Sequence, residues 1–133
     1  MDTLLLIHGH NRWLVAIVWS ALLVALGWAR LGWSESAFRV CWGLLLILLG
    51  LLAVQLLIGG VLFVWKWQHS GSIPHYRWEH VVLMLGALSV LHLPLRWRRL
   101  PLPARWRRTL WSVLLAGGLL FLGVARLPKG WLG

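Results

Sequence analysis

Two histidines lie at matching depth near the starts of two long apolar segments. His8 lies in the stretch LLLIHGHNRW and His80 in the stretch YRWEHVVLML. With helices expected to start near Thr3 and Tyr76, each histidine is about five residues inside its helix, and at a rise of about 1.5 Å per residue the axial depths agree within a turn. If the two helices run in the same direction, the facing imidazoles are suited to bind one haem iron from both sides.

The other histidines fit this role less well. His10 is about 200° around the helix from His8, so only one of the two can face the interior, and we expect it to be His8. His92 lies about 18 Å along the axis from His80. No histidine on another segment shares that level, so we expect His92 to be hydrogen-bonded in the bundle or to line a quinone-sized cleft. The histidines expected to be solvated in a loop are His69 and His75.

A few further polar residues accompany the histidine pair. A polar group in lipid costs several kcal/mol unless it is satisfied, so each is a candidate for function. Arg77, one turn outward of the second histidine, is expected to bind haem propionates through charge-assisted hydrogen bonds. Arg12 either pairs with Glu79 or reaches the interface by its long stem. Gln55 has three alternative targets: a backbone carbonyl, a histidine ring or a quinone oxygen.

Apolar segments dominate the chain that must position these residues. The 133 residues are 60% hydrophobic and only 12% charged, which is typical of a membrane protein. Four apolar runs, at about 4–28, 40–65, 76–95 and 109–126, approach or exceed the roughly 20 residues that cross a bilayer as a helix. Their short connections favour antiparallel neighbours. We therefore predict an all-α, integral membrane four-helix up-down-up-down bundle, with residues 1–133 as a single transmembrane domain.

Small and apolar residues inside these runs are interpreted as packing residues. Cys41 is expected to be an apolar helix residue, and Met84, one turn from the second histidine, is expected to pack rather than to bind metal. The pairs Gly59–Gly60 and Gly117–Gly118 would allow close helix contact or make room for a flat ligand.

The first apolar run is expected to be retained rather than cleaved as a signal peptide, because no basic residue precedes it. The tryptophans expected to anchor the ends of the spans are Trp33, Trp42, Trp65, Trp67, Trp78, Trp111 and Trp131.

Positive charge is concentrated in one connection. The formal charge is +10, and the stretch from Arg96 to Arg108 alone carries six arginines. The positive-inside rule places this connection in the cytoplasm and both termini outward. Its interleaved tryptophans and prolines suit a segment that rests on anionic headgroups, at about 1 kcal/mol per basic residue. We therefore predict the lipid bilayer as its partner and no nucleic acid.

Three segments together resemble a known family. LLLIHGHNRWLV, VQLLIGGVLF and RWEHVVLMLGALSVLHLP, in this order, resemble small four-span bacterial membrane proteins described as cytochrome b-like. The resemblance covers three of the four spans. It implies one haem b, with His8 and His80 as the paired histidines and Arg12, Gln55 and Glu79 as accompanying polar positions. It also implies the bacterial inner (cytoplasmic) membrane.

The leading functional hypothesis is a membrane-embedded b-type cytochrome that carries electrons through one haem, exchanging with the quinone pool or with redox partner proteins. The alternative is a haem-free structural or assembly subunit of a respiratory or photosynthetic membrane complex. The expected protein partners are the other subunits of a larger complex or further copies of this chain in a homo-oligomer. A transporter is disfavoured because Asp2, Glu35 and Glu79 all lie at segment ends. The sequence has no nucleophile and base arrangement, carboxylate pair or nucleotide loop, which favours an electron carrier or subunit over a stand-alone enzyme.

Overall fold

The structure, a computed structural model, describes residues 1–132, and every regular element within them is a helix. The bounds are Asp2–Gly32 for α1, Glu35–Ser70 for α2, His75–His92 for α3 and Leu102–Ala125 for α4, with a 3-10 helix, η1, over Leu93–Trp97. All four long helices, α3 taken together with η1, are long and apolar enough to cross a membrane. The predicted all-α, four-helix chain is thus confirmed for the described residues.

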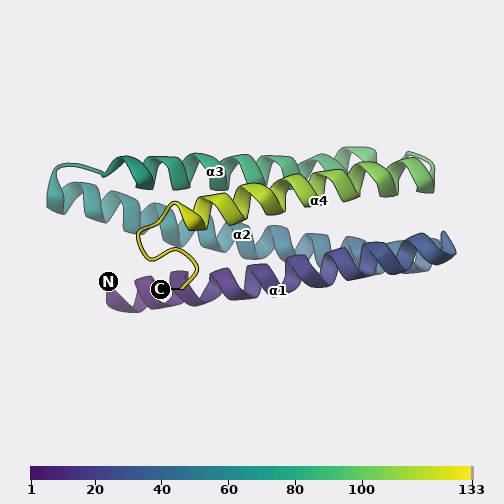
Figure 1. Ribbon diagram of the computed structural model, residues 1–133, viewed down its shortest axis with the longest axis horizontal. Helices are drawn as coiled ribbons and strands as arrows, with labels where there is room; N and C mark the ends of the chain where they lie inside the picture. Colours follow the sequence, from purple (N-terminus) through teal and green to yellow (C-terminus); the bar gives the residue numbers. More distant parts are fainter. Residues whose placement is uncertain (133) are drawn as a thin grey trace.

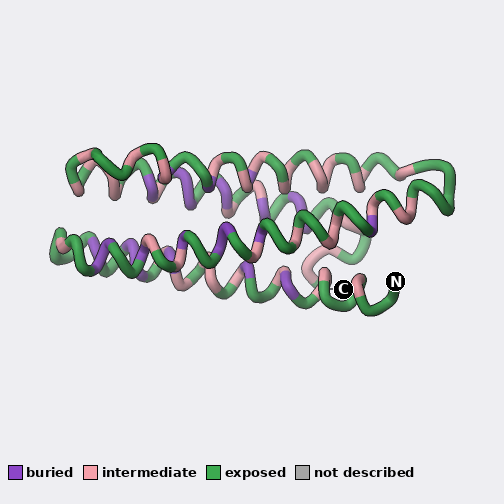
Figure 2. Tube along the Cα trace, turned by 180° about the vertical axis from the view of Figure 1, so that it is seen from behind, coloured by how far each residue is buried: buried purple, intermediate pink, exposed green. Residues whose placement is uncertain are grey.

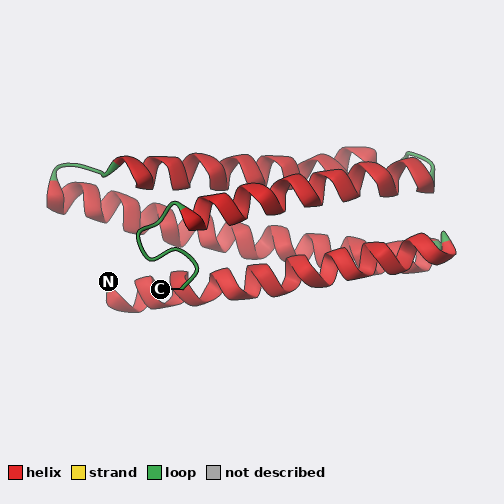
Figure 3. Cartoon of the chain, viewed as in Figure 1, coloured by secondary structure: helices red, strands yellow, loops and turns green. Residues whose placement is uncertain are grey.

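The helices form two antiparallel hairpins. α1 packs mainly against α2, and α3 mainly against α4, while the hairpins contact each other through α1 with α4 and α2 with α3. The directions of the helices alternate along the chain, so α1 and α3 run the same way on opposite corners of the bundle (Figure 1). The connections between the helices are short (Figure 3). The described end of the chain returns to the end of the bundle where α1 begins (Figure 1).

Hydrogen bonds from two tryptophans join the hairpins. The Trp19 indole on α1 donates to the Val113 carbonyl of α4 at 2.9 Å, and the Trp106 indole on α4 donates to the Leu26 carbonyl of α1 at 2.7 Å. An indole N–H inside an apolar environment needs such a partner. These two side chains therefore fix the α1–α4 contact at two levels.

The arginine-rich connection is shorter than the sequence suggested. Arg96 belongs to η1 and the last three arginines lie on the first turns of α4, so only residues 98–101 connect the two helices. The prolines explain the difference. Pro101 and Pro103 break a helix interior, but the first turn of a helix needs no N–H donors, so α4 can begin on them. The basic residues are therefore held on helical surfaces rather than on a flexible loop.

Close packing is confined to one half of the bundle. The fully buried side chains lie mostly in the C-terminal halves of α1 and α3 and the N-terminal halves of α2 and α4 (Figure 2). Cys41 is among them at 1% exposure, as expected for an apolar residue. The large fully buried residues on the four helices are Leu22, Leu26, Leu45, Leu48, Leu91 and Val113. The opposite half, where α1 and α3 begin, has few buried side chains and holds the residues singled out by the sequence.

Candidate functional site

The two predicted histidines meet across the diagonal of the bundle. The ring centroids of His8 on α1 and His80 on α3 are 6.5 Å apart, with 75° between the ring planes. Two imidazoles that share one metal through bonds of about 2 Å have centroids roughly 6 Å apart. The helix starts at Asp2 and His75 lie within one residue of the expected ones, which is why the two depths agree. The geometry is thus compatible with a single shared metal.

The orientation of His80 is set by the neighbouring helix. Its Nδ1 lies 2.7 Å from the Gly123 carbonyl oxygen of α4. A carbonyl can only accept, so the proton is assigned to Nδ1 and the lone pair remains on Nε2. A Cβ at Gly123 would overlap Met84 Cε and lie 3.3 Å from Leu83 Cβ, so the close approach depends on glycine. Metal-binding histidines are commonly oriented by such a backbone carbonyl.

The His8 ring is confined but lacks a polar partner. A Cβ added to Gly59 of α2 would lie 3.0 Å from His8 Cε1, so the ring rests directly on this glycine. His8 Nδ1 is buried and has no hydrogen-bond partner among residues 1–132. A buried, unsatisfied polar group costs about 1–3 kcal/mol. A ligand that bonded to Nδ1 itself would remove that cost.

Gln55 holds the backbone of the first histidine. Its Nε2 donates to the His8 carbonyl at 3.0 Å, and its Oε1 accepts from Asn11 Nδ2 at 2.7 Å. Asn11 is buried and also donates to the Leu51 carbonyl at 3.3 Å. Of the three targets considered for Gln55, the structure shows the backbone carbonyl. Gln55 lines the cavity, but its amide locks α1 to α2 at the level of His8.

A cavity of about 640 Å³ surrounds the two imidazoles. Its lining is mainly apolar and comes from α1, α2, α3 and the segment after α4. The polar and glycine residues that line it are His8, Gln55, Gly59, Gly60, Tyr76, Arg77, His80 and Lys129. The volume lies within the range of roughly 300–1,000 Å³ found for cofactor and ligand sites. A largely apolar space of this size could hold a cofactor or a lipid chain.

Two cations flank this cavity. Arg77 lines it beside the second histidine, as predicted, and its Nε is buried without a hydrogen-bond partner among the residues described. Lys129, which the sequence analysis did not single out, lines it from the segment after α4. Lys129 lies after the end of α4, so no helical periodicity in the sequence indicates where its side chain lies. Its position depends on the path that the chain takes back toward the start of α1. An anionic group on the occupant would find both cations at the cavity wall.

Arg12 positions this returning segment instead of lining the cavity. Arg12 donates from Nη1 to the Gly130 carbonyl oxygen at 3.0 Å. Trp131 stacks on Phe121 with centroids 5.9 Å apart and donates its indole N–H to the Phe121 carbonyl at 3.2 Å. Glu79, considered as a partner of Arg12, contacts His75 at 3.3 Å and Arg126 at 3.5 Å. The role of Arg12 is thus to anchor the segment that carries Lys129.

The remaining histidines lie outside the cavity. His10, His69 and His92 are exposed, and each has its Nδ1 within 2.8 Å of the carbonyl four residues earlier on its own helix. His75 is exposed as expected. His92 is not among the residues that line the histidine cavity. Met84 packs against Gly123 and lines the cavity.

Within residues 1–132, no group of three or more His, Cys, Asp and Glu side chains is arranged to hold a metal ion. The candidate centre therefore rests on a pair of imidazoles. Comparison with known proteins finds no family model, no curated protein and no solved structure that matches this chain. The resemblance to cytochrome b-like proteins stays a prediction.

Proposed function

We propose that this protein is a membrane cytochrome that binds one b-type haem between His8 and His80 and carries electrons. The observation that carries the proposal is the convergence of two imidazoles, 6.5 Å between centroids, inside a largely apolar cavity of about 640 Å³. When bound, haem supplies a one-electron redox couple whose potential depends on its axial ligands and surroundings. The chain's own residues supply binding, orientation and exclusion of water.

The polar residues around the cavity fit the chemistry of such a group. His80 is held in the tautomer that leaves Nε2 free, and the buried Nδ1 of His8 lacks a protein partner among the described residues. Arg77 and Lys129 provide positive charge for the carboxylates of the porphyrin. A lipid chain would fill the volume but would leave these four groups unused. This difference favours haem over lipid as the occupant.

We further propose that electrons are exchanged within or at the surface of the bacterial cytoplasmic membrane. The arginine-rich end would face the cytoplasm and the histidine end the outside, by the positive-inside rule. We place no quinone at Gln55, because both polar ends of its amide already have partners. A quinone or a redox protein would therefore meet the haem at its edge.

Reduced-minus-oxidised absorption spectra of the purified protein test the proposal. Protein made with ample haem should show the bands of a low-spin haem, and a pyridine haemochrome assay should give one haem per chain. His8→Ala and His80→Ala should each remove or convert these bands. The matched controls are His10→Ala and His69→Ala, since both histidines are exposed and bonded only to their own helix.

Two outcomes would contradict the proposal. Equal spectra for all four histidine variants would exclude His8 and His80 as the ligands. Haem-free wild-type protein that is folded by circular dichroism would favour the alternative, a structural or assembly subunit. That alternative also predicts stable co-purification with other membrane proteins.

A further inference from the structure

The segment after α4 forms part of the wall of the histidine cavity. Residues 127–129 line the cavity, although they lie outside the four long helices. Figure 1 shows this segment, in yellow, running from the end of α4 back to the beginning of α1. The Gly130 N–H donates to the Leu127 carbonyl at 2.9 Å, which closes a tight turn with Gly130 at φ 49°. Glycine adopts that conformation more readily than residues with a side chain, so the turn depends on it.

Contacts at its two ends tie this segment to both helices that carry the paired histidines. At one end, Arg126 Nε lies 3.5 Å from Glu79 Oε2 of α3. At the other end, Arg12 of α1 donates to the carbonyl oxygen of the turn glycine at 3.0 Å. Beside it, the Trp131 indole meets Trp13 of α1 edge to face, with 5.7 Å between ring centroids. The segment therefore bridges α3 and α1 along one side of the cavity.

This bridge is the least buried part of the cavity wall. None of residues 126–132 is buried, and segments with few buried contacts open locally at a free energy well below that of global unfolding. Where α2 and α3 form the wall, Phe63 and Trp78 meet edge to face at 4.8 Å, so opening there requires two helices to part. The segment after α4 can therefore move with the least disturbance of the bundle.

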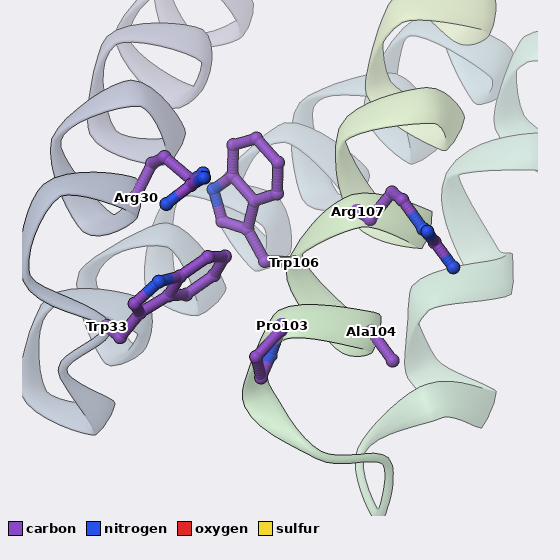
Figure 4. A pocket seen from close by; sticks show the side chains of 6 residues that line it. All are labelled: Arg30, Trp33, Pro103, Ala104, Trp106 and Arg107. Atoms are coloured by element: carbon purple, nitrogen blue, oxygen red, sulfur yellow. The ribbon is translucent and has the colours of Figure 1, made fainter.

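The opposite end of the bundle keeps the two hairpins together while this segment moves. There the Trp33 and Trp106 indoles meet edge to face at 5.7 Å, beside a hollow lined by the end of α1 and the start of α4 (Figure 4). Trp106 also donates to the Leu26 carbonyl of α1 at 2.7 Å. Because these contacts lie on helices far from the histidines, movement of the segment after α4 leaves them intact.

We propose that residues 127–131 form a strap that opens to admit haem and closes to retain it, with Arg12 and Trp131 as its latch. This inference rests on the proposed function. In the closed position the strap holds Lys129 at the cavity wall, where its charge favours the carboxylates of the bound group. Arg12 and Trp131 are positioning residues, because they act on the bound group only through the strap. Closure slows dissociation without adding a bond to the iron.

Transfer of haem from the purified full chain to excess apomyoglobin measures how often the strap opens. Trp131→Ala should raise the transfer rate about tenfold, because two ring contacts and one hydrogen bond of the latch are lost. The low-spin spectrum should stay unchanged, since both paired histidines remain. The matched control is Trp33→Ala, which removes an edge-to-face indole pair of the same 5.7 Å separation at the other end of the bundle. Arg12→Gln removes the other part of the latch and should also raise the rate.

Three results in this assay would overturn the proposal. Equal transfer rates for the wild type and both latch variants would show that the strap does not control release. Equal acceleration by Trp131→Ala and Trp33→Ala would indicate general loosening of the bundle. Loss of the low-spin spectrum in both latch variants would make the segment a fixed part of the site instead of a moving cover.

A second measurement reports on the strap without haem. In a Cys41→Ala background, Leu52→Cys places one thiol in the cavity wall, at a position that is 5% exposed. A charged methanethiosulfonate reagent is excluded from the detergent-covered sides and enters from the aqueous end. Trp131→Ala should accelerate labelling of this thiol, whereas Trp33→Ala should not. Unchanged labelling would contradict the strap even if haem binds. Accelerated labelling of a chain that binds no haem would support the strap and refute the proposed function.

Discussion

Gly117 and Gly118 are adjacent residues with opposite surroundings. A Cβ on Gly117 would overlap the Trp19 indole of α1, whereas a Cβ on Gly118 would meet nothing within 4 Å. Trp19 cannot easily withdraw, because its indole N–H is bound to the Val113 carbonyl at 2.9 Å. Replacing each glycine by alanine therefore measures the contact between the two hairpins.

The expected free energies follow from three contributions. Alanine in place of glycine favours a helix by about 1 kcal/mol at either position. At Gly117, overpacking against the ring costs about 1–3 kcal/mol, and loss of the Trp19 hydrogen bond costs about 0.5–1.5 kcal/mol more. We therefore expect Gly118→Ala to raise the free energy of unfolding by up to about 1 kcal/mol. Gly117→Ala should lower it by roughly 1–3 kcal/mol.

Unfolding of the detergent-solubilised variants, followed by circular dichroism, provides the measurement. A double-mutant cycle supplies the control: in a Trp19→Ala background the cost of Gly117→Ala should largely disappear, because the obstructing ring is gone. If Gly117→Ala and Gly118→Ala have equal stability, or if the cost persists without the indole, the described α1–α4 packing is wrong.

Two further predictions concern the histidine end. Gly59→Ala should displace the His8 ring, whose Cε1 would lie 3.0 Å from the new Cβ, and shift or abolish the haem absorption. Gly50→Ala, on the same helix but outside the cavity lining and with open space around it, should leave the spectrum unchanged; identical spectra for the two variants would remove Gly59 from the site. Asn11→Leu should lower the free energy of unfolding by about 1–3 kcal/mol by leaving the Gln55 oxygen without its donor. Its effect should not add to that of Gln55→Leu, and strict additivity in the thermal or chemical unfolding data would show that the two side chains do not form one network.

The four long helices could be predicted because each contains a long charge-free apolar run. The structure differs from the prediction in the residues at which these helices begin and end. α2 begins at Glu35 rather than near residue 40, because the Ser34 hydroxyl accepts from the backbone N–H of Ser36 at 3.1 Å and caps the helix. The start of α4 was missed for a different reason. Proline disfavours a helix interior and suits a first turn, and sequence alone does not say which applies.

The candidate site was predictable only in part. The depths of His8 and His80 follow from helix rise, so their convergence could be anticipated. Asn11 carried a usable signal, since a residue three places after His8 shares its helix face. Gly123 and Lys129 carried none, because their importance comes from a neighbouring helix and from the path of the returning chain.

The uneven packing of the bundle has a consequence for assembly. Tight side-chain contacts join the hairpins at the arginine-rich end, whereas at the histidine end a cavity of about 640 Å³ lies between them and Arg12 is bonded to the segment after α4. On the proposed function, haem would enter this cavity from the side after the helices are in place, so that insertion of the chain and binding of haem would be separate steps.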